Sequence, residues 1–223
     1  MEKMFKKSEL VNQGFNAMSL SRRVKKQELG NLGFGFYIAN PKNLKFENDE
    51  LMQQINRLLD GYPFPPKRVV FSSKSLNFCI NQLISASTYL VEVEKEYLQS
   101  VFETLKNTVG NVVLFKPSQE EKLNYWKPNA IYVTELYKRS PVNKDGSIAI
   151  EKLIFDLLFD EDIYSLYSGS DIEMAIHILC TEYCINYKTL FSYATRKSRK
   201  SELLERIENM IPSEILEVLS RDK

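Results

Sequence analysis

The chain of 223 residues lacks long apolar runs. No stretch of about 18 consecutive hydrophobic residues occurs, so the sequence predicts no membrane-spanning helix. Its first ten residues are charged and lack the hydrophobic core of a signal peptide. Cysteine is scarce too. The three cysteines have a number and spacing that suggest no disulfide framework. Together these absences predict a protein of the reducing cytoplasm.

Residues for common catalytic sites are also missing. The only histidine, His177, has no second histidine near it and is expected to form a surface pair with Glu173. Cys180 and Cys184 share one helix face and are expected in the core or partly buried. The glycines of residues 30–35 follow neither the P-loop nor the Rossmann pattern. We therefore expect no enzymatic activity, no cofactor and no metal ion.

Charge is present but unevenly placed. The whole chain has a formal net charge of +1, yet residues 1–46 hold nine Lys/Arg against three Asp/Glu, a net charge of +6. The remaining residues have a net charge of −5. This division is typical of a polyanion-binding module attached to an acidic body, although a solvated basic end without a partner explains it equally well.

The pattern of residues 1–46 predicts a small helical domain with a hairpin. A short helix over 6–13 ends before Gly14, and Asn16 can cap a second helix over 17–27. Three glycines between apolar residues over 28–39 favour a hairpin. A short helix, a glycine turn, a basic helix and a glycine-rich hairpin together predict a winged helix-turn-helix.

The remainder is expected to be one α/β domain over 67–223, after a linker over 47–66 that contains a helix at 48–60 and the spacer PFPPK. Strands alternate with amphipathic helices, and a helical region follows from Ile148, with a capping box at Ser170 and Glu173. The expected strands are 68–72, 88–94, 111–116 and 130–136, and the expected helices are 75–86, 96–108, 187–196, 199–210 and 213–221. The fold class is therefore α/β, or mixed α+β.

The helix over 17–27 carries the candidate DNA-binding site. Ala17, Leu20 and Val24 share the spacing of a buried face. Arginine hydrogen-bonds guanine or phosphate, and lysine neutralises phosphate, so an opposite cationic face suits a major groove. A solvated basic face without a partner is the plain alternative. The candidate DNA contacts are Ser19, Arg22, Arg23, Lys26, Asn16 and Lys25.

The ordered series of motifs resembles the AbiEi-type antitoxins of abortive-infection systems and related transcriptional regulators. The run KKSELVNQGFNAMSLSRRVKKQELGNLGFGFYIA is similar to their amino-terminal winged helix. The segments KSLNFCINQL, TYLVEVEKEYLQSVFETLK, IYVTELYKRSPV, IAIEKLIFDLLFD, YSGSDIEMA and YATRKSRKSELL resemble their carboxy-terminal domain in order and spacing. One departure is the expected wing, which has Asn31 and Phe34 where the family often has arginine.

The resemblance implies a transcriptional autorepressor that acts as the antitoxin of a toxin–antitoxin module. Its implied partners are double-stranded DNA, as operator repeats of its own operon, and a nucleotidyltransferase toxin. Such a protein has no membrane partner. The implied DNA contacts are Ser19, Arg22, Arg23 and Lys26.

Two alternatives stay open. The first is a protein-interaction module with a vestigial winged helix, which the uncharged wing favours. The second is a degenerate nuclease-like enzyme, because Glu92 and Glu94 lie on one face of a strand. Against it, an E-x-K motif that ends at Lys95 requires a glutamate two residues earlier, and that position is Val93. A possible secondary basic patch, which could contact nucleic acid or an acidic partner, consists of Arg196, Lys197, Arg199 and Lys200.

Overall fold

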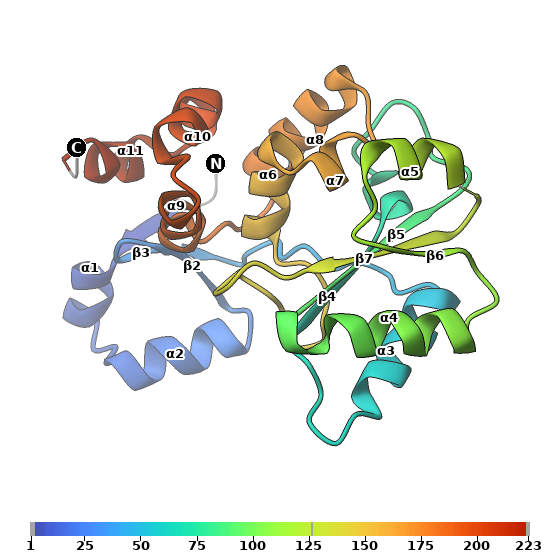
Figure 1. The fold of residues 1–223 in the computed structure, drawn as a ribbon. Coiled ribbons are helices and arrows are strands. Elements are labelled where there is room, and N and C mark those ends of the chain that lie inside the picture. Colours follow the sequence, from blue (N-terminus) through green and yellow to red (C-terminus); the bar gives the residue numbers. More distant parts are fainter. Residues whose placement is uncertain (1–2, 126, 222–223) are drawn as a thin grey trace. The chain divides into compact units, whose positions relative to one another are not determined.

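The computed structural model describes residues 3–125 and 127–221, and it has a mixed α/β fold with two sheets. The chain divides into two compact units (Figure 1). Unit 1 consists of residues 1–45 and 176–223, and unit 2 consists of residues 46–175. The second boundary between them falls inside one helix, α8 (Gly169–Glu182).

Unit 1 contains a three-stranded antiparallel sheet of order β1-β3-β2, so the first strand pairs with the last. In Figure 1, α1 and α2 lie on one face of this sheet and α9 lies on the other. The elements are β1 (Met4–Lys6), α1 (Lys7–Asn12), α2 (Ala17–Lys25), β2 (Leu29–Gly33), β3 (Phe36–Ala39), α9 (Tyr187–Arg196), α10 (Lys200–Ile207), the 3₁₀ turn η3 (Glu208–Met210) and α11 (Ser213–Arg221).

A small apolar core holds α1 and α2 against the sheet. Leu10 of α1, Leu20 of α2 and Leu29 of β2 are buried together, and Phe5 and Tyr37 pack against them. Strand side chains alternate between the two faces of a sheet, so a side chain at Gly30 would point to the face opposite that of Leu29. A Cβ atom at Gly30 would meet the Sγ of Cys184 at 2.5 Å, which shows how closely the carboxy-terminal segment packs there.

Unit 2 contains a mixed sheet of order β4-β5-β7-β6, in which β4 is antiparallel to β5 and the other neighbours are parallel. The parallel pairs require crossover connections, and α4 and α5 supply them. The elements are α3 (Glu50–Asp60), β4 (Arg68–Ser72), η1 (Ser73–Leu76), β5 (Thr88–Val93), η2 (Lys95–Tyr97), α4 (Leu98–Thr108), β6 (Val113–Phe115), α5 (Gln119–Tyr125), β7 (Ala130–Glu135), α6 (Ile150–Phe159), α7 (Glu161–Tyr164) and the first half of α8.

Helices cover both faces of this sheet. In Figure 1, α3 and α4 lie on one face and α5 and α6 on the other. The core under α3 and α4 includes Val91 and Val93 of β5 and Val133 of β7, all 0% exposed. Because side chains alternate along a strand, Leu90 and Glu92 of β5 face the α6 side instead.

The division into units differs from the expected one. We expected residues 47–66 to be a linker, but α3 buries Met52, Ile55 and Leu59 in the core of unit 2. We expected residues 67–223 to form one domain, but residues 176–223 belong with the amino-terminal unit. The physical reason is that the sheet of unit 1 has two apolar faces, and α1 and α2 cover only one of them.

Two local predictions were wrong. Residues 75–86 form no helix beyond η1, because side chains take over the backbone hydrogen bonds of this loop: Asn77 bonds both the N–H and the carbonyl of Ile84, and Asp171 accepts from the N–H of Asn81. The capping residue of α8 is Ser168 rather than Ser170: Oγ of Ser168 accepts from the N–H of Asp171 at 3.2 Å and donates to the Asp171 carboxylate at 2.7 Å. No helix in the described part of the chain has both the length and the apolar character that crossing a bilayer requires.

Candidate functional site

Helix α2 of unit 1 is fixed at its start by the predicted cap. Oδ1 of Asn16 accepts a hydrogen bond from the N–H of Ser19 at 2.9 Å, as an N-cap side chain does. The preceding turn runs from Gln13 to Asn16, and Gly14 adopts φ +90°, a left-handed conformation that favours glycine. Helices α1 and α2 are thus joined by a four-residue turn that contains a glycine, the local sequence of elements that a helix-turn-helix requires.

Three of the predicted DNA contacts are engaged within the unit. Asn16 caps α2, and the hydroxyl of Ser19 donates to the carbonyl of Asn16 at 2.8 Å. The guanidinium of Arg23 lies over the ring of Phe15, 4.4 Å from its centroid, and its Nε lies 3.6 Å from a carboxylate oxygen of Glu28. These side chains hold α2 in place, and the hydroxyl of Ser19 and the guanidinium of Arg23 are less available as donors to a partner.

The other three predicted contacts, Arg22, Lys25 and Lys26, are exposed. Met18 joins them on the solvent side of α2, with 64% of its surface exposed. Met18, Arg22 and Lys25 follow the i, i+4, i+7 spacing of one helix face, opposite the buried Leu20. We name this set the α2 face: Met18, Arg22, Lys25 and Lys26. The sequence prediction missed Met18, although its helical spacing from Arg22 was a usable signal.

The hairpin β2–β3 is compact and carries no cation at its turn. Oδ1 of Asn31 accepts from the N–H of Gly33 at 2.9 Å, so this side chain stabilises the turn. Gly33, with φ +86°, packs against the start of α9, where an added Cβ would meet the backbone nitrogen of Lys188 at 2.6 Å. The uncharged turn of this hairpin is therefore a packing surface for the start of α9.

The possible secondary basic patch lies at the junction of α9 and α10, within unit 1. Arg199 forms an ion pair with Glu202, with 2.7 Å between Nη1 and Oε1. Arg196 and Lys197 lie over the ring of Tyr193, 5.8 Å and 5.9 Å from its centroid. Lys200 begins α10. Each of the first three thus has a partner in the chain, as a charged junction between helices would.

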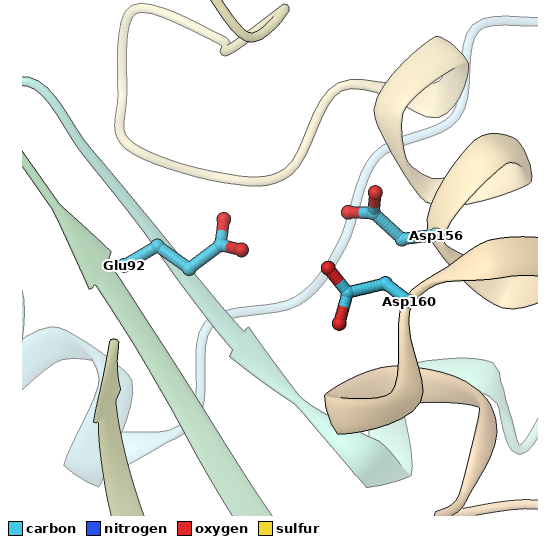
Figure 2. A group of neighbouring side chains, drawn as sticks. All are labelled: Glu92, Asp156 and Asp160. Carbon is cyan, nitrogen blue, oxygen red and sulfur yellow. The ribbon is translucent and has the colours of Figure 1, made fainter. Parts of the chain in front are cut away.

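Unit 2 holds a second group of charged side chains, and these are buried or partly buried. Glu92 of β5, Asp156 of α6 and Asp160 at the end of α6 each place one carboxylate oxygen within 4.8 Å of the others. Figure 2 shows the three carboxylates turned toward one another. Nζ of Lys152 lies 2.8 Å from Oε2 of Glu92 and also contacts Oδ2 of Asp156. We call Glu92, Lys152, Asp156 and Asp160 the charged cluster.

Burial governs the electrostatics of the cluster. Asp156 is 0% exposed and Lys152 is 1% exposed. Burial raises the pKa of the Asp156 carboxyl to about 7; the adjacent Lys152 ammonium lowers it, and the charges of Glu92 and Asp160 raise it again. An excess of carboxylates over ammonium groups in this interior therefore favours taking up a positive charge.

One family model matches the sequence of most of the chain, including parts of both units. A family model described as "Family of unknown function (DUF6577)" matches residues 16–213. The chain belongs to this family. A comparison with curated proteins found no match. The DUF6577 model includes α2 from its cap residue Asn16 and all of the charged cluster. It does not connect the chain to the AbiEi-type antitoxins, so that resemblance stays a prediction.

In this member of DUF6577, the structure separates the two glutamates of the nuclease-like alternative. Glu92 belongs to the charged cluster. Glu94 instead accepts a hydrogen bond from the N–H of Lys67 at 3.1 Å, at the end of β5. The lysine beside Glu92 is Lys152 of α6 rather than Lys95. The nuclease-like alternative needs two strand glutamates and a strand lysine in one site. Glu92, Glu94 and Lys95 do not form such a site.

The remaining candidates of this DUF6577 chain have simple surroundings. His177 lies exposed on α8. Cys180 is buried, and burial raises the pKa of its thiol to about 12, so it is not a thiolate near neutral pH. Chemically, the α2 face is suited to bind an anionic partner, and the charged cluster is suited to bind a cation.

Proposed function

We propose that unit 1 binds double-stranded DNA through the α2 face and that the protein is a transcriptional regulator. The observation that carries the proposal is the combination of fold and charge: α2 and its C-cap residue present the exposed cations Arg22, Lys25 and Lys26 away from the buried Leu20. Arg23 is exposed too, but its guanidinium lies over Phe15. In a helix-turn-helix motif the second helix enters the major groove.

The arrangement of unit 1 supports a winged form of the motif. A strand precedes the two helices, a hairpin follows them, and the first strand pairs with the last in the order β1-β3-β2. The hairpin therefore extends from the end of α2, where a wing is needed. Because its turn carries no lysine or arginine, the proposal assigns the main contacts to α2 rather than to the wing.

The chemistry of the α2 face fits a duplex. Arg22, Lys25 and Lys26 can neutralise phosphates, and arginine can also bond the acceptor edge of guanine. The exposed thioether of Met18 offers an apolar contact beside them, the type of contact that a thymine methyl group accepts. Polar and apolar contacts on one face suit sequence-specific binding.

The test is fluorescence anisotropy with a labelled promoter fragment of the protein's own operon and a scrambled duplex of equal length. Replacing Arg22, Lys25 and Lys26 with alanine is expected to weaken binding by about 100-fold or more, and to reduce the slope of log K against log salt by about 2.7. The charge-matched control replaces Lys74, Lys95 and Lys144, all exposed in unit 2, and should bind like the wild type. Absence of binding at low salt, or equal loss in both variants, contradicts the proposal.

The resemblance to AbiEi-type proteins extends the proposal to a more specific role. The protein would repress its own operon in the cytoplasm and act as an antitoxin against a nucleotidyltransferase toxin. The support is the ordered series of sequence motifs. Co-expression with a nucleotidyltransferase encoded in the same operon should restore growth, and failure to do so leaves the DNA-binding proposal standing while rejecting the antitoxin role.

A further inference from the structure

We infer that the charged cluster of unit 2 binds a hard divalent cation, such as Mg²⁺, Mn²⁺ or Ca²⁺, through Glu92, Asp156 and Asp160. These residues offer three carboxylate oxygens within 4.8 Å of one another. Such cations bind oxygen ligands at about 2.0–2.6 Å, so ligands on opposite sides of the ion are about 4–5 Å apart. The spacing of the three carboxylates thus matches a shared ion.

A second observation concerns one oxygen atom. Oδ1 of Asp156 is buried and has no hydrogen-bond partner among the residues that the structure describes, while Oδ2 contacts Lys152. A buried carboxylate oxygen without a partner is energetically costly and is normally satisfied by a proton donor, a water molecule or an ion. Figure 2 shows the carboxylate of Asp156 turned toward those of Glu92 and Asp160, so an ion between them would give this carboxylate a second partner beside Lys152.

The net charge of the cluster also favours cation binding. With all groups ionised, three carboxylates and the ammonium of Lys152 leave a net charge of −2 in the cluster. Lys152 already neutralises one charge, from the side of Glu92 and Asp156. A divalent cation would neutralise the remainder, and oxygen-only ligands select hard cations.

The elements that carry the three ligands fix their positions and leave the site accessible to solvent. Glu92 lies on β5, between β4 and β7 in the sheet, and Asp156 lies in the second turn of α6. Asp160 is only partly buried, so the cluster reaches the surface of the unit at this residue. Asp160 also caps α7, because its Oδ1 accepts a hydrogen bond from the N–H of Asp162 at 3.0 Å. This bond fixes the carboxylate of Asp160.

Calorimetric titration of the chelator-treated full chain with MgCl₂, MnCl₂ and CaCl₂, at constant ionic strength, tests the inference. At least one cation should bind one saturable site. Asp160→Asn should weaken this binding at least tenfold, since it removes a charged ligand, yet asparagine keeps the capping oxygen of α7. Glu92→Gln and Asp156→Asn should do the same. Glu94→Gln, directly after the end of β5 and outside the cluster, is the control and should change the affinity less than twofold.

Two results overturn the inference. One is the absence of saturable binding by the wild type with all three cations up to about 10 mM, tenfold above the weakest protein calcium sites. The other is equal affinity of Asp160→Asn and Glu94→Gln. If Glu92→Gln or Asp156→Asn fails to fold by circular dichroism, Asp160→Asn still decides, because it leaves both partners of Lys152 in place. The outcome does not depend on DNA binding by unit 1.

Discussion

The two units use charge in opposite ways. Unit 1 has 17 Lys/Arg and 10 Asp/Glu, a net charge of +7, whereas unit 2 has 13 and 19, a net charge of −6. The cations of the α2 face in unit 1 are exposed, but the charged cluster of unit 2 is inside the fold. The near-neutral total of the chain conceals both features.

This contrast has an energetic consequence. Exposed cations contribute little to folding and remain available to a partner. Buried carboxylates must be neutralised where they lie, by an ammonium, a proton or a metal ion, because isolated buried charges are strongly unfavourable. Substitutions in the α2 face should therefore change binding, and substitutions in the charged cluster should change stability.

The largest expected effect is on the stability of the cluster. Lys152→Met should reduce the free energy of unfolding by about 3–5 kcal/mol, since it leaves the carboxylates of Glu92 and Asp156 buried without their ammonium. Urea unfolding followed by circular dichroism measures this loss. Millimolar Ca²⁺ should restore part of it, because the ion would replace the missing positive charge.

The matched control is Lys74→Met, at an exposed position of the same unit, which should stay within about 0.5 kcal/mol of the wild type. If Lys152→Met is equally mild, Lys152 does not neutralise the carboxylates as the structure indicates, and the contrast between the units fails.

The sequence predicted α1, α2 and the hairpin β2–β3 of unit 1 well because each has a local cause, but it missed β1. Asn16 caps α2, Gly14 forms the turn before it, and glycines shape the hairpin β2–β3. These features depend on neighbours within a few residues. It was harder to predict which exposed side chains of α2 are engaged within the unit, as Arg23 is by the ring of Phe15 and the carboxylate of Glu28.

The charged cluster could not be predicted in the same way, because its residues meet only in the folded unit. A strand template places a lysine close to Glu92 in sequence, but Lys152 comes from a helix 60 residues later. One signal was nevertheless present. In the apolar segment KLIFDLLFD, the charged residues Lys152, Asp156 and Asp160 recur every four positions, so they share a helix face that an otherwise buried helix must place in the interior.

A smaller effect tests whether the carboxy-terminal helices pack on the hairpin of unit 1. Gly33→Ala should destabilise the protein by about 3 kcal/mol, since the new methyl group meets the backbone of Lys188 and the residue has φ +86°. Gly14→Ala is the matched control: Gly14 has φ +90° but nothing within 4 Å, so only the conformational cost of about 1 kcal/mol should remain. Thermal and urea unfolding measure both; equal losses would show that Lys188 does not pack against Gly33.

The smallest expected effect distinguishes two neighbouring arginines of α2. Arg22→Ala should weaken DNA binding about tenfold, or about 1.4 kcal/mol, because its exposed guanidinium is free to reach the duplex. Arg23→Ala should weaken binding less than threefold and instead lower stability by about 0.5–1 kcal/mol, since its guanidinium lies over Phe15. Each variant removes the same charge from the same helix, so a difference in anisotropy titrations reports position alone. If Arg23→Ala has the larger effect on binding, the face predicted from sequence, with Ser19 and Arg23, contacts DNA. The α2 face would then not be the contact surface.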